Sequence, residues 1–94
     1  MAISPNNAEA VALQALAFLV ADEDLLPVFQ GSSGASADDL RAGATDPAFL
    51  ASVLDFILMD DAWVMRFCDT VQLPYETVMQ ARHGLPGGEM VNWT

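Results

Sequence analysis

The feature that most constrains the fold of this chain is a pattern that occurs twice. The stretches FLVADEDLLPVF (residues 18–29) and FILMDDAWVMRF (residues 56–67) are both twelve residues long and both begin and end with Phe. Each carries three apolar residues and then an acidic pair, and the second starts 38 residues after the first. A recurrence of this kind indicates a duplicated structural unit whose copies bury their apolar faces against each other.

Helix start and stop signals divide the first half into three helices. The first begins with Ser4 as its cap and Pro5 at its first position, where a missing N–H has no partner to lose. It is apolar over most of its circumference, which predicts a central helix. A second helix is expected to start near Asp24 and to end at Gly31. Ser36, followed three residues later by an acid, predicts a capped third helix.

The same signals restart in the second half. Asp46 and Pro47 begin a long helix, Asp60 caps a new one, and the last runs from Pro74 to Gly84. The polar side of the long helix is expected to hold the following residues: Ala51, Ser52 and Asp55. Phe29 and Phe67, which end the two related stretches, are predicted to lie in the core and each to contact both halves.

The sequence therefore predicts an all-α fold of six short helices in two related three-helix halves, packed with approximate two-fold symmetry. Ninety-four residues make one domain, residues 1–94. The halves are expected to span about residues 8–44 and 46–84, and a tail follows over residues 85–94.

Four stretches in a fixed order carry a resemblance: ALAFL, LLPVF, TDPAFLASVLDFIL and LPYETVMQAR. Together they resemble a family of short all-helical bacterial proteins described only as a domain of unknown function. The resemblance covers about residues 8–85 and implies the helical fold, without an activity, a cofactor or a catalytic residue. Leu73 departs from it, because a polar cap before Pro-Tyr-Glu is more usual.

The charge of the chain is strongly unbalanced. Thirteen acidic residues face three arginines, there is no Lys, and the net charge is −10. Such a chain repels nucleic-acid phosphates and anionic membranes, so neither is an expected partner. The acidic surface serves solubility, a basic partner, or mimicry of a nucleic acid. The single cysteine cannot form an internal disulfide, which predicts a cytoplasmic protein.

Residues that could carry catalysis or bind a metal are few. A nucleophile needs a base beside it, and the sequence offers Cys68 and the only histidine, His83. The position of His83 near a helix end favours an interaction with the helix dipole, and Cys68 beside Phe67 is typical of a small buried hydrophobe. No spacing of acids matches a metal site. We expect no catalytic, metal-binding or cofactor-binding residue, no cofactor, and no enzyme.

One stretch, CDTVQLPYETVMQAR, resembles the turn and recognition helix of a helix-turn-helix protein. Gln72 stands where the turn usually has Gly, and the only base of the last helix, Arg82, lies near its far end. A helix-turn-helix-like DNA-binding protein is therefore the alternative to the favoured function, a non-enzymatic protein–protein interaction or regulatory module. An acidic protein that mimics a nucleic acid is the third.

The tail, LPGGEMVNWT, is more apolar than an idle terminus. Pro86, Gly87 and Gly88 are expected to interrupt the last helix. Met90, Val91 and Trp93 are expected to dock on the same domain, or to contact a partner protein or a second copy in a homodimer.

Overall fold

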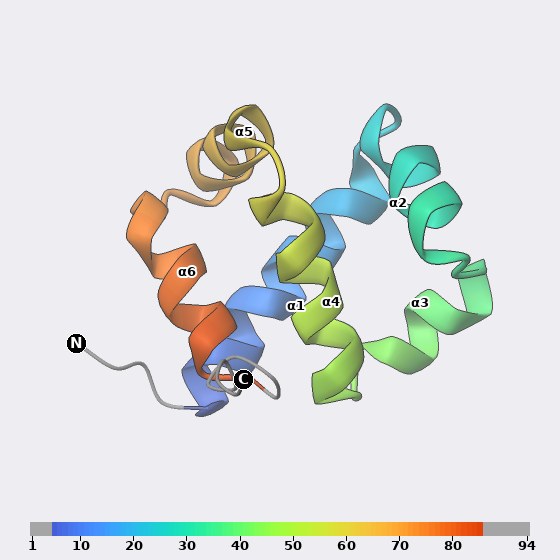
Figure 1. Cartoon of the computed structure of the whole chain (residues 1–94), viewed down its shortest axis with the longest axis horizontal. Helices are drawn as coiled ribbons and strands as arrows, with labels where there is room; N and C mark the ends of the chain where they lie inside the picture. The colour runs from blue at the N-terminus through green and yellow to red at the C-terminus, as the bar shows by residue number, and fades with distance from the viewer. Residues whose placement is uncertain (1–4, 86–94) are drawn as a thin grey trace, which may run out of the picture.

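The structure is a computed structural model and describes residues 5–85. In this region the chain is built of α-helices joined by short turns (Figure 1). Over these residues there are six helices and no strand, as the sequence predicts. In chain order the helices are α1 (Pro5–Ala21), α2 (Leu25–Ser33), α3 (Ala37–Gly43), α4 (Pro47–Leu58), α5 (Asp61–Val71) and α6 (Tyr75–His83). None of the helices in this region has the length and apolarity that crossing a membrane requires.

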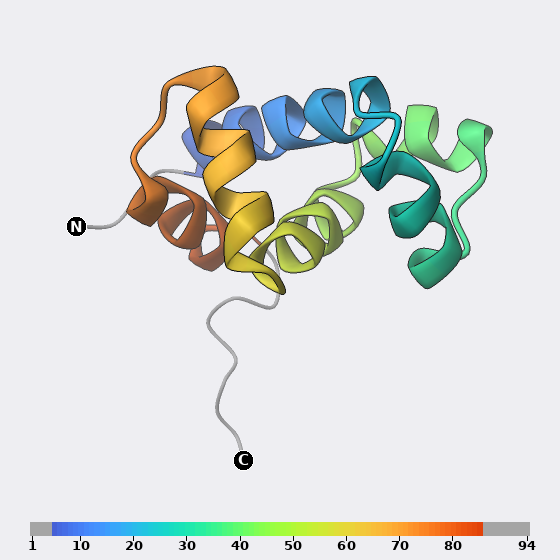
Figure 2. The same cartoon turned by 90° about the horizontal axis from the view of Figure 1, so that it is seen from above.

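Helices α1 and α4 cross at the centre of the molecule, with α5 and α6 on one side of the pair and α2 and α3 on the other (Figures 1 and 2). The central position of α1 agrees with its apolar sequence, since it packs against α2, α4, α5 and α6. The largest fully buried side chains are Phe29, Phe67, Leu19, Leu50, Leu54, Ile57, Val53, Val78 and Cys68.

Capping residues fix the starts of three helices where the sequence predicts them. Ser36 and Asp39 form a reciprocal capping box at α3. The Asp39 amide nitrogen lies 3.2 Å from the Ser36 Oγ, and the Ser36 amide nitrogen lies 3.0 Å from the Asp39 Oδ2. Asp46 and Asp60 each accept a hydrogen bond from the amide two residues further on, at 3.0 Å and 2.8 Å, at the starts of α4 and α5. Each such cap typically contributes about 1 kcal/mol of stability.

The end of α2 differs from the prediction. The helix passes through Gly31 and ends at Ser33, because Gly34 and not Gly31 adopts the left-handed conformation that closes a helix, with φ of 75°. The Gly34 amide donates to the carbonyl of Gln30 at 2.9 Å. Gly31, three residues earlier, lies within the helix.

Two exposure predictions are corrected by the packing. Ala51 was expected on the polar side of α4 but is buried, because α1, α3, α5 and α6 all pack against α4 and leave little of it open. Conversely, Leu13 and Val20 continue the apolar circumference of α1 but are exposed. Asp55 is exposed as predicted and forms an ion pair with Arg82.

Aromatic side chains link the two halves of the chain. Phe67 on α5 lies against Phe18 on α1 with ring centroids 5.4 Å apart, and Phe29 on α2 lies against Phe56 on α4 at 5.1 Å. Phe29 also meets Phe49, at 6.1 Å. The predictions for Phe29 and Phe67 are therefore confirmed: both are buried, and each contacts the other half. Such pairs contribute about 0.5–1.5 kcal/mol each beyond the area they bury.

One glycine is required by close packing between α3 and α4. A methyl group at Gly43, the last residue of α3, would lie 2.1 Å from the ring of Phe49. That distance is far shorter than a van der Waals contact, so any side chain at Gly43 would displace the ring or the helix. Gly43 therefore sets how closely the end of α3 approaches α4.

Candidate interaction surface

The residues considered for catalysis do not come together. Cys68 is buried on α5, and its thiol lies 3.8 Å from the carbonyl oxygen of Pro74. Burial raises the pKa of the Cys68 thiol, and the neighbouring Asp69 carboxylate raises it further, so the reactive thiolate is disfavoured. His83 is exposed at the end of α6. Within residues 5–85 no group of three potential ligands could hold a metal ion.

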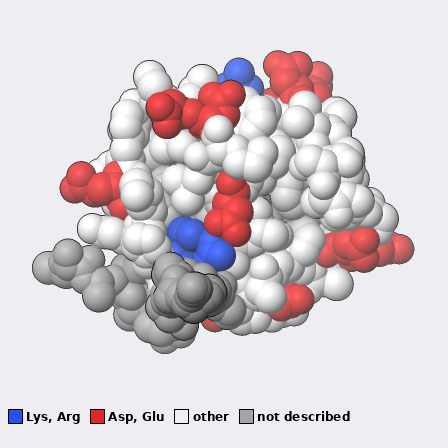
Figure 3. Space-filling model, viewed as in Figure 1, with Lys and Arg blue, Asp and Glu red and all other residues white. Residues whose placement is uncertain are grey.

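Many acidic side chains are engaged with the protein's own backbone or arginines. Such contacts are made by Asp22, Asp38, Asp39, Asp46, Asp55 and Asp60. All three arginines also take part in ion pairs, Arg41 with Asp38, Arg66 with Asp22, and Arg82 with Asp55. The face seen in Figure 3 accordingly shows scattered carboxylates and few basic groups.

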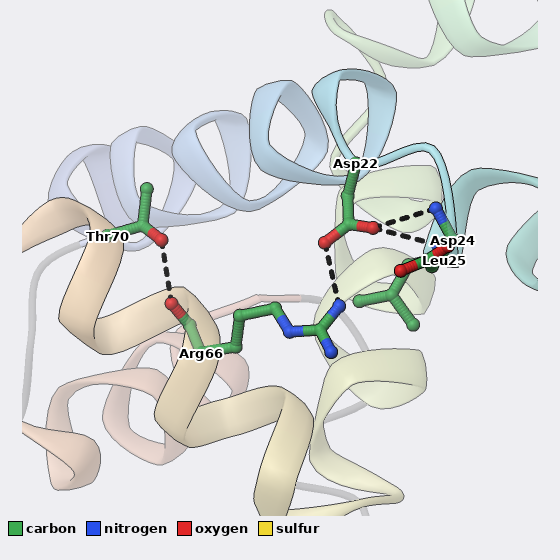
Figure 4. A network of polar contacts seen from close by, with 5 residues as sticks. All are labelled: Asp22, Asp24, Leu25, Arg66 and Thr70. Carbon is green, nitrogen blue, oxygen red and sulfur yellow. Dashed lines mark hydrogen bonds and ion pairs between the residues drawn. The ribbon is translucent and has the colours of Figure 1, made fainter.

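Asp22 joins the two halves through the network drawn in Figure 4. One carboxylate oxygen accepts from the amides of Asp24 and Leu25, at 2.9 Å and 3.1 Å, and so organises the start of α2. The other accepts from the Arg66 guanidinium on α5 at 2.9 Å. The hydrogen bond from Arg66, with help from the two amides, lowers the pKa of Asp22, so the carboxylate stays ionised in the folded protein.

An apolar groove lies between the end of α4 and helices α5 and α6, and we call it the Met groove. It has a volume of about 640 Å³. It is lined by Leu58, Asp61, Val64, Met65, Tyr75, Glu76 and Met79. Three of the lining side chains are about half exposed: Met65 at 46%, Tyr75 at 49% and Met79 at 54%.

The residues of the Met groove are not among the site residues that the sequence predicts, although the sequence carries a signal for them. Three methionines, Met59, Met65 and Met79, lie in the second half, and residues 8–44 contain none. Methionines on the solvent side of amphipathic helices are typical of adaptable binding surfaces. Recognising the groove from sequence would have required the relative orientation of α5 and α6, which depends on tertiary packing.

A second groove lies between α1, α2 and α3 and has a volume of about 470 Å³. Its lining residues are Leu16, Val20, Leu26, Gln30, Ala37, Leu40, Arg41 and Ala44. Four of them precede Met-groove residues by 38 positions: Val20 and Leu58, Leu26 and Val64, Ala37 and Tyr75, Arg41 and Met79. The two grooves therefore share a 38-residue offset at these four positions, with different chemistry.

The part of the chain that resembles a helix-turn-helix forms α5, a turn and α6. Gln72 takes the left-handed conformation, with φ of 61°, that the more usual glycine would adopt. The last helix begins at Tyr75 behind Pro74 and has no side-chain cap, as the unusual Leu73 suggests. Its first turns expose Tyr75, Glu76 and Met79, so no cation stands where a recognition helix reads bases.

The tail residues Met90, Val91 and Trp93, predicted to contact the domain, a partner or a second copy, lie outside the described residues. Their role stays a prediction.

A family model described as "Protein of unknown function (DUF3572)" matches residues 5–88, so the chain belongs to that family. This confirms the resemblance to a domain of unknown function. Comparison with curated proteins and with solved structures gave no match.

The lowered pKa of Asp22 generates a prediction about pH. A carboxylate whose pKa is depressed by folding stabilises the protein above its unfolded-state pKa, and that contribution is lost as the pH falls through the folded-state pKa. Asp22→Asn keeps an oxygen for the α2 amides but removes the charge that faces Arg66. We expect this variant to be less stable than wild type at neutral pH, and the difference to shrink below about pH 5.

Urea midpoints measured from neutral to acidic pH test this prediction. The matched control is Asp38→Asn, which removes a longer ion pair between side chains that are mostly exposed. A difference between wild type and Asp22→Asn that does not change with pH would contradict the role of the Asp22 charge.

Proposed function

We propose that this protein is a non-enzymatic protein-interaction module, and the Met groove is the observation that carries the proposal. Contiguous apolar surface rimmed by polar residues is typical of binding sites for other proteins. In the Met groove the side chains of Met65, Tyr75 and Met79 are left about half exposed between two packed helices. Methionine has an unbranched, polarisable side chain that adapts to different partners at small cost.

The chemistry of the groove supports binding and not catalysis. An enzyme site gathers a nucleophile, a base and charge-stabilising donors in one pocket. In the Met groove the polar groups are the exposed carboxylates of Asp61 and Glu76 and the Tyr75 hydroxyl. Neither Cys68 nor His83 lines it.

The proposed module is a duplicated unit whose halves are related by an approximate two-fold axis. The hydrogen bonds at Asp22 and Asp60 support this: each carboxylate accepts from the amide two residues on, and each carbonyl accepts from the amide four residues on. The crossed aromatic pairs also support the two-fold relation. Phe67 stands 38 residues after Phe29, and Phe18 stands 38 residues before Phe56, so exchanging the halves turns one pair into the other.

The two grooves also support the two-fold relation, because four pairs of their lining residues are 38 positions apart. The proposed symmetry is approximate at the third helix of each half. Helix α6 packs against α1, α4 and α5, whereas α3 packs chiefly against α4. Wider packing of α6 places Met79 and Tyr75 beside α5 and builds the larger groove on that side.

Other parts of the proposal rest on composition. The single cysteine supports a cytoplasmic location, and the apolar tail residues support contact with the same domain, with a partner or with a second copy in a homodimer. Mimicry of a nucleic acid is less well supported, because many carboxylates are engaged with the chain's own amides and arginines, as described above.

DNA binding is the alternative class, and the ion pairs argue against it. Arg66 and Arg82 are paired with Asp22 and Asp55, and the net charge of −10 repels phosphates. We expect fluorescence anisotropy with a random DNA duplex at low salt to show no binding near micromolar concentration. Micromolar binding that weakens steeply with salt would contradict this expectation and favour the helix-turn-helix reading.

The interaction function is tested with a charge placed in the groove. Because Met79 is half exposed, Met79→Glu should change stability by about 0.5 kcal/mol or less but should put a third carboxylate on an apolar docking surface. Proteins captured from the native cell extract by the wild type are expected to be lost with this variant.

The matched control is Val28→Glu, a change at a similarly exposed apolar residue on α2, at 46%, that lines neither groove. It should retain the captured proteins. If Met79→Glu retains the same proteins as the wild type, the Met groove is not the interaction site. Thermal melts of both variants show that the fold is intact.

A further inference from the structure

The Met groove has an apolar floor and an acidic rim. Leu58, Val64, Met65 and Met79 supply the apolar surface. The two charged lining residues are both acids, Asp61 in the first turn of α5 and Glu76 in the first turn of α6, and both are exposed. No lysine or arginine lines the groove. A ligand is therefore met by apolar surface in the middle and by negative charge at the edge.

The walls of the groove also restrict the backbone conformation of the ligand. Every lining residue belongs to a helix, and residues 5–85 contain no strand, so the walls of the groove offer no sheet edge. An extended peptide needs partners for its own N–H and C=O groups and usually finds them at a sheet edge, which the helical walls do not offer. A helix brings its backbone hydrogen bonds with it and presents only side chains.

The second groove shows which features are particular to the Met groove. At the place that matches Met79 it carries Arg41, and at the place that matches Tyr75 it carries Ala37. The second groove therefore has a cation in place of the Met79 thioether and a methyl group in place of the Tyr75 ring. A positively charged helix would meet the Arg41 guanidinium there, although Asp38 pairs with it at 3.6 Å.

We infer that the Met groove binds an amphipathic helix of a partner protein, with apolar residues spaced at i, i+3, i+4 and i+7 and with Lys or Arg flanking that stripe. The apolar stripe covers Met65 and Met79, and the basic flanks face Asp61 and Glu76. This inference rests on the proposed function and adds to it the charge and conformation of the partner. The overall charge of −10 steers such a helix toward the protein before contact.

The experiment uses the full-length protein and designed helical peptides of roughly 15–18 residues, long enough for a stable helix. The peptides share one apolar stripe and differ only in the flanking residues, which are Lys and Arg, Gln, or Glu. Calorimetry measures their affinities, and methyl NMR of the methionines reports where they bind. We expect the basic peptide to bind about tenfold or more tighter than the neutral one, a difference that shrinks as salt screens the charges.

Two sets of variants locate the binding. Met79→Arg places in the Met groove the residue type that Arg41 supplies at the matching position of the second groove. It should lower the affinity for the basic peptide by about tenfold or more. The volume-conserving Met79→Leu should bind this peptide like wild type. The double variant Asp61→Asn with Glu76→Gln should lower the affinity of the basic peptide toward that of the neutral one and leave the neutral peptide unchanged. The Met65 and Met79 methyl signals should shift on binding in the wild type.

Each contrary outcome has a distinct meaning. If the neutral and basic peptides bind equally in the groove, the charge of the partner is inferred wrongly while the interaction function stands. If the basic peptide binds Met79→Arg as well as wild type, the general acidic surface holds it and the inference is overturned. If no peptide binds, the inference is also overturned. The same holds if a second copy of the chain occupies the groove, which would appear as shifts of the methionine signals that grow with protein concentration alone. The cell-extract comparison of Met79→Glu with Val28→Glu tests the interaction function separately.

Discussion

Two crossed aromatic contacts hold the halves of this chain together. Phe67 on α5 reaches Phe18 on α1, and Phe29 on α2 reaches Phe56 on α4. Each ring that ends one of the two similar stretches therefore packs on the ring that begins the other, so both halves contribute to each aromatic contact. Helices α1 and α4, which each supply one ring of these pairs, also pack against each other at the centre. Helices α2, α3, α5 and α6 lie outside them (Figures 1 and 2). On the side of α5 and α6 lies the Met groove.

Local structure was largely predictable from the sequence because its determinants are neighbours in the chain. The capping box at Ser36 and the caps at Asp46 and Asp60 depend on oxygens and amides two or three residues apart. The same reasoning failed at the end of α2, where Gly31 and Gly34 are equally good helix terminators by composition. Gly34 takes the left-handed conformation, and nothing in the local composition distinguishes it from Gly31.

Features that depend on tertiary packing could not be read from the sequence. Asp22 and Arg66 are 44 residues apart, and nothing local distinguishes their ion pair from other acids and bases. The burial of Ala51 follows from the helices that pack around α4, and the Met groove is formed by residues of three helices, α4, α5 and α6. Sequence periodicity gives the apolar face of each helix but not which part of that face stays uncovered.

Coupling between the crossed rings tests most directly whether reciprocal contacts between the two halves of the chain hold the fold. Phe→Leu substitutions remove a ring while keeping much of its volume, and double-mutant cycles measured by urea unfolding isolate each pair. Reciprocal packing predicts coupling energies of about 0.5–1.5 kcal/mol for both Phe18 with Phe67 and Phe29 with Phe56. It predicts coupling near zero for Phe29 with Phe67, which make no ring contact with each other. Coupling in only one crossed pair, or equal coupling in all three, would contradict it.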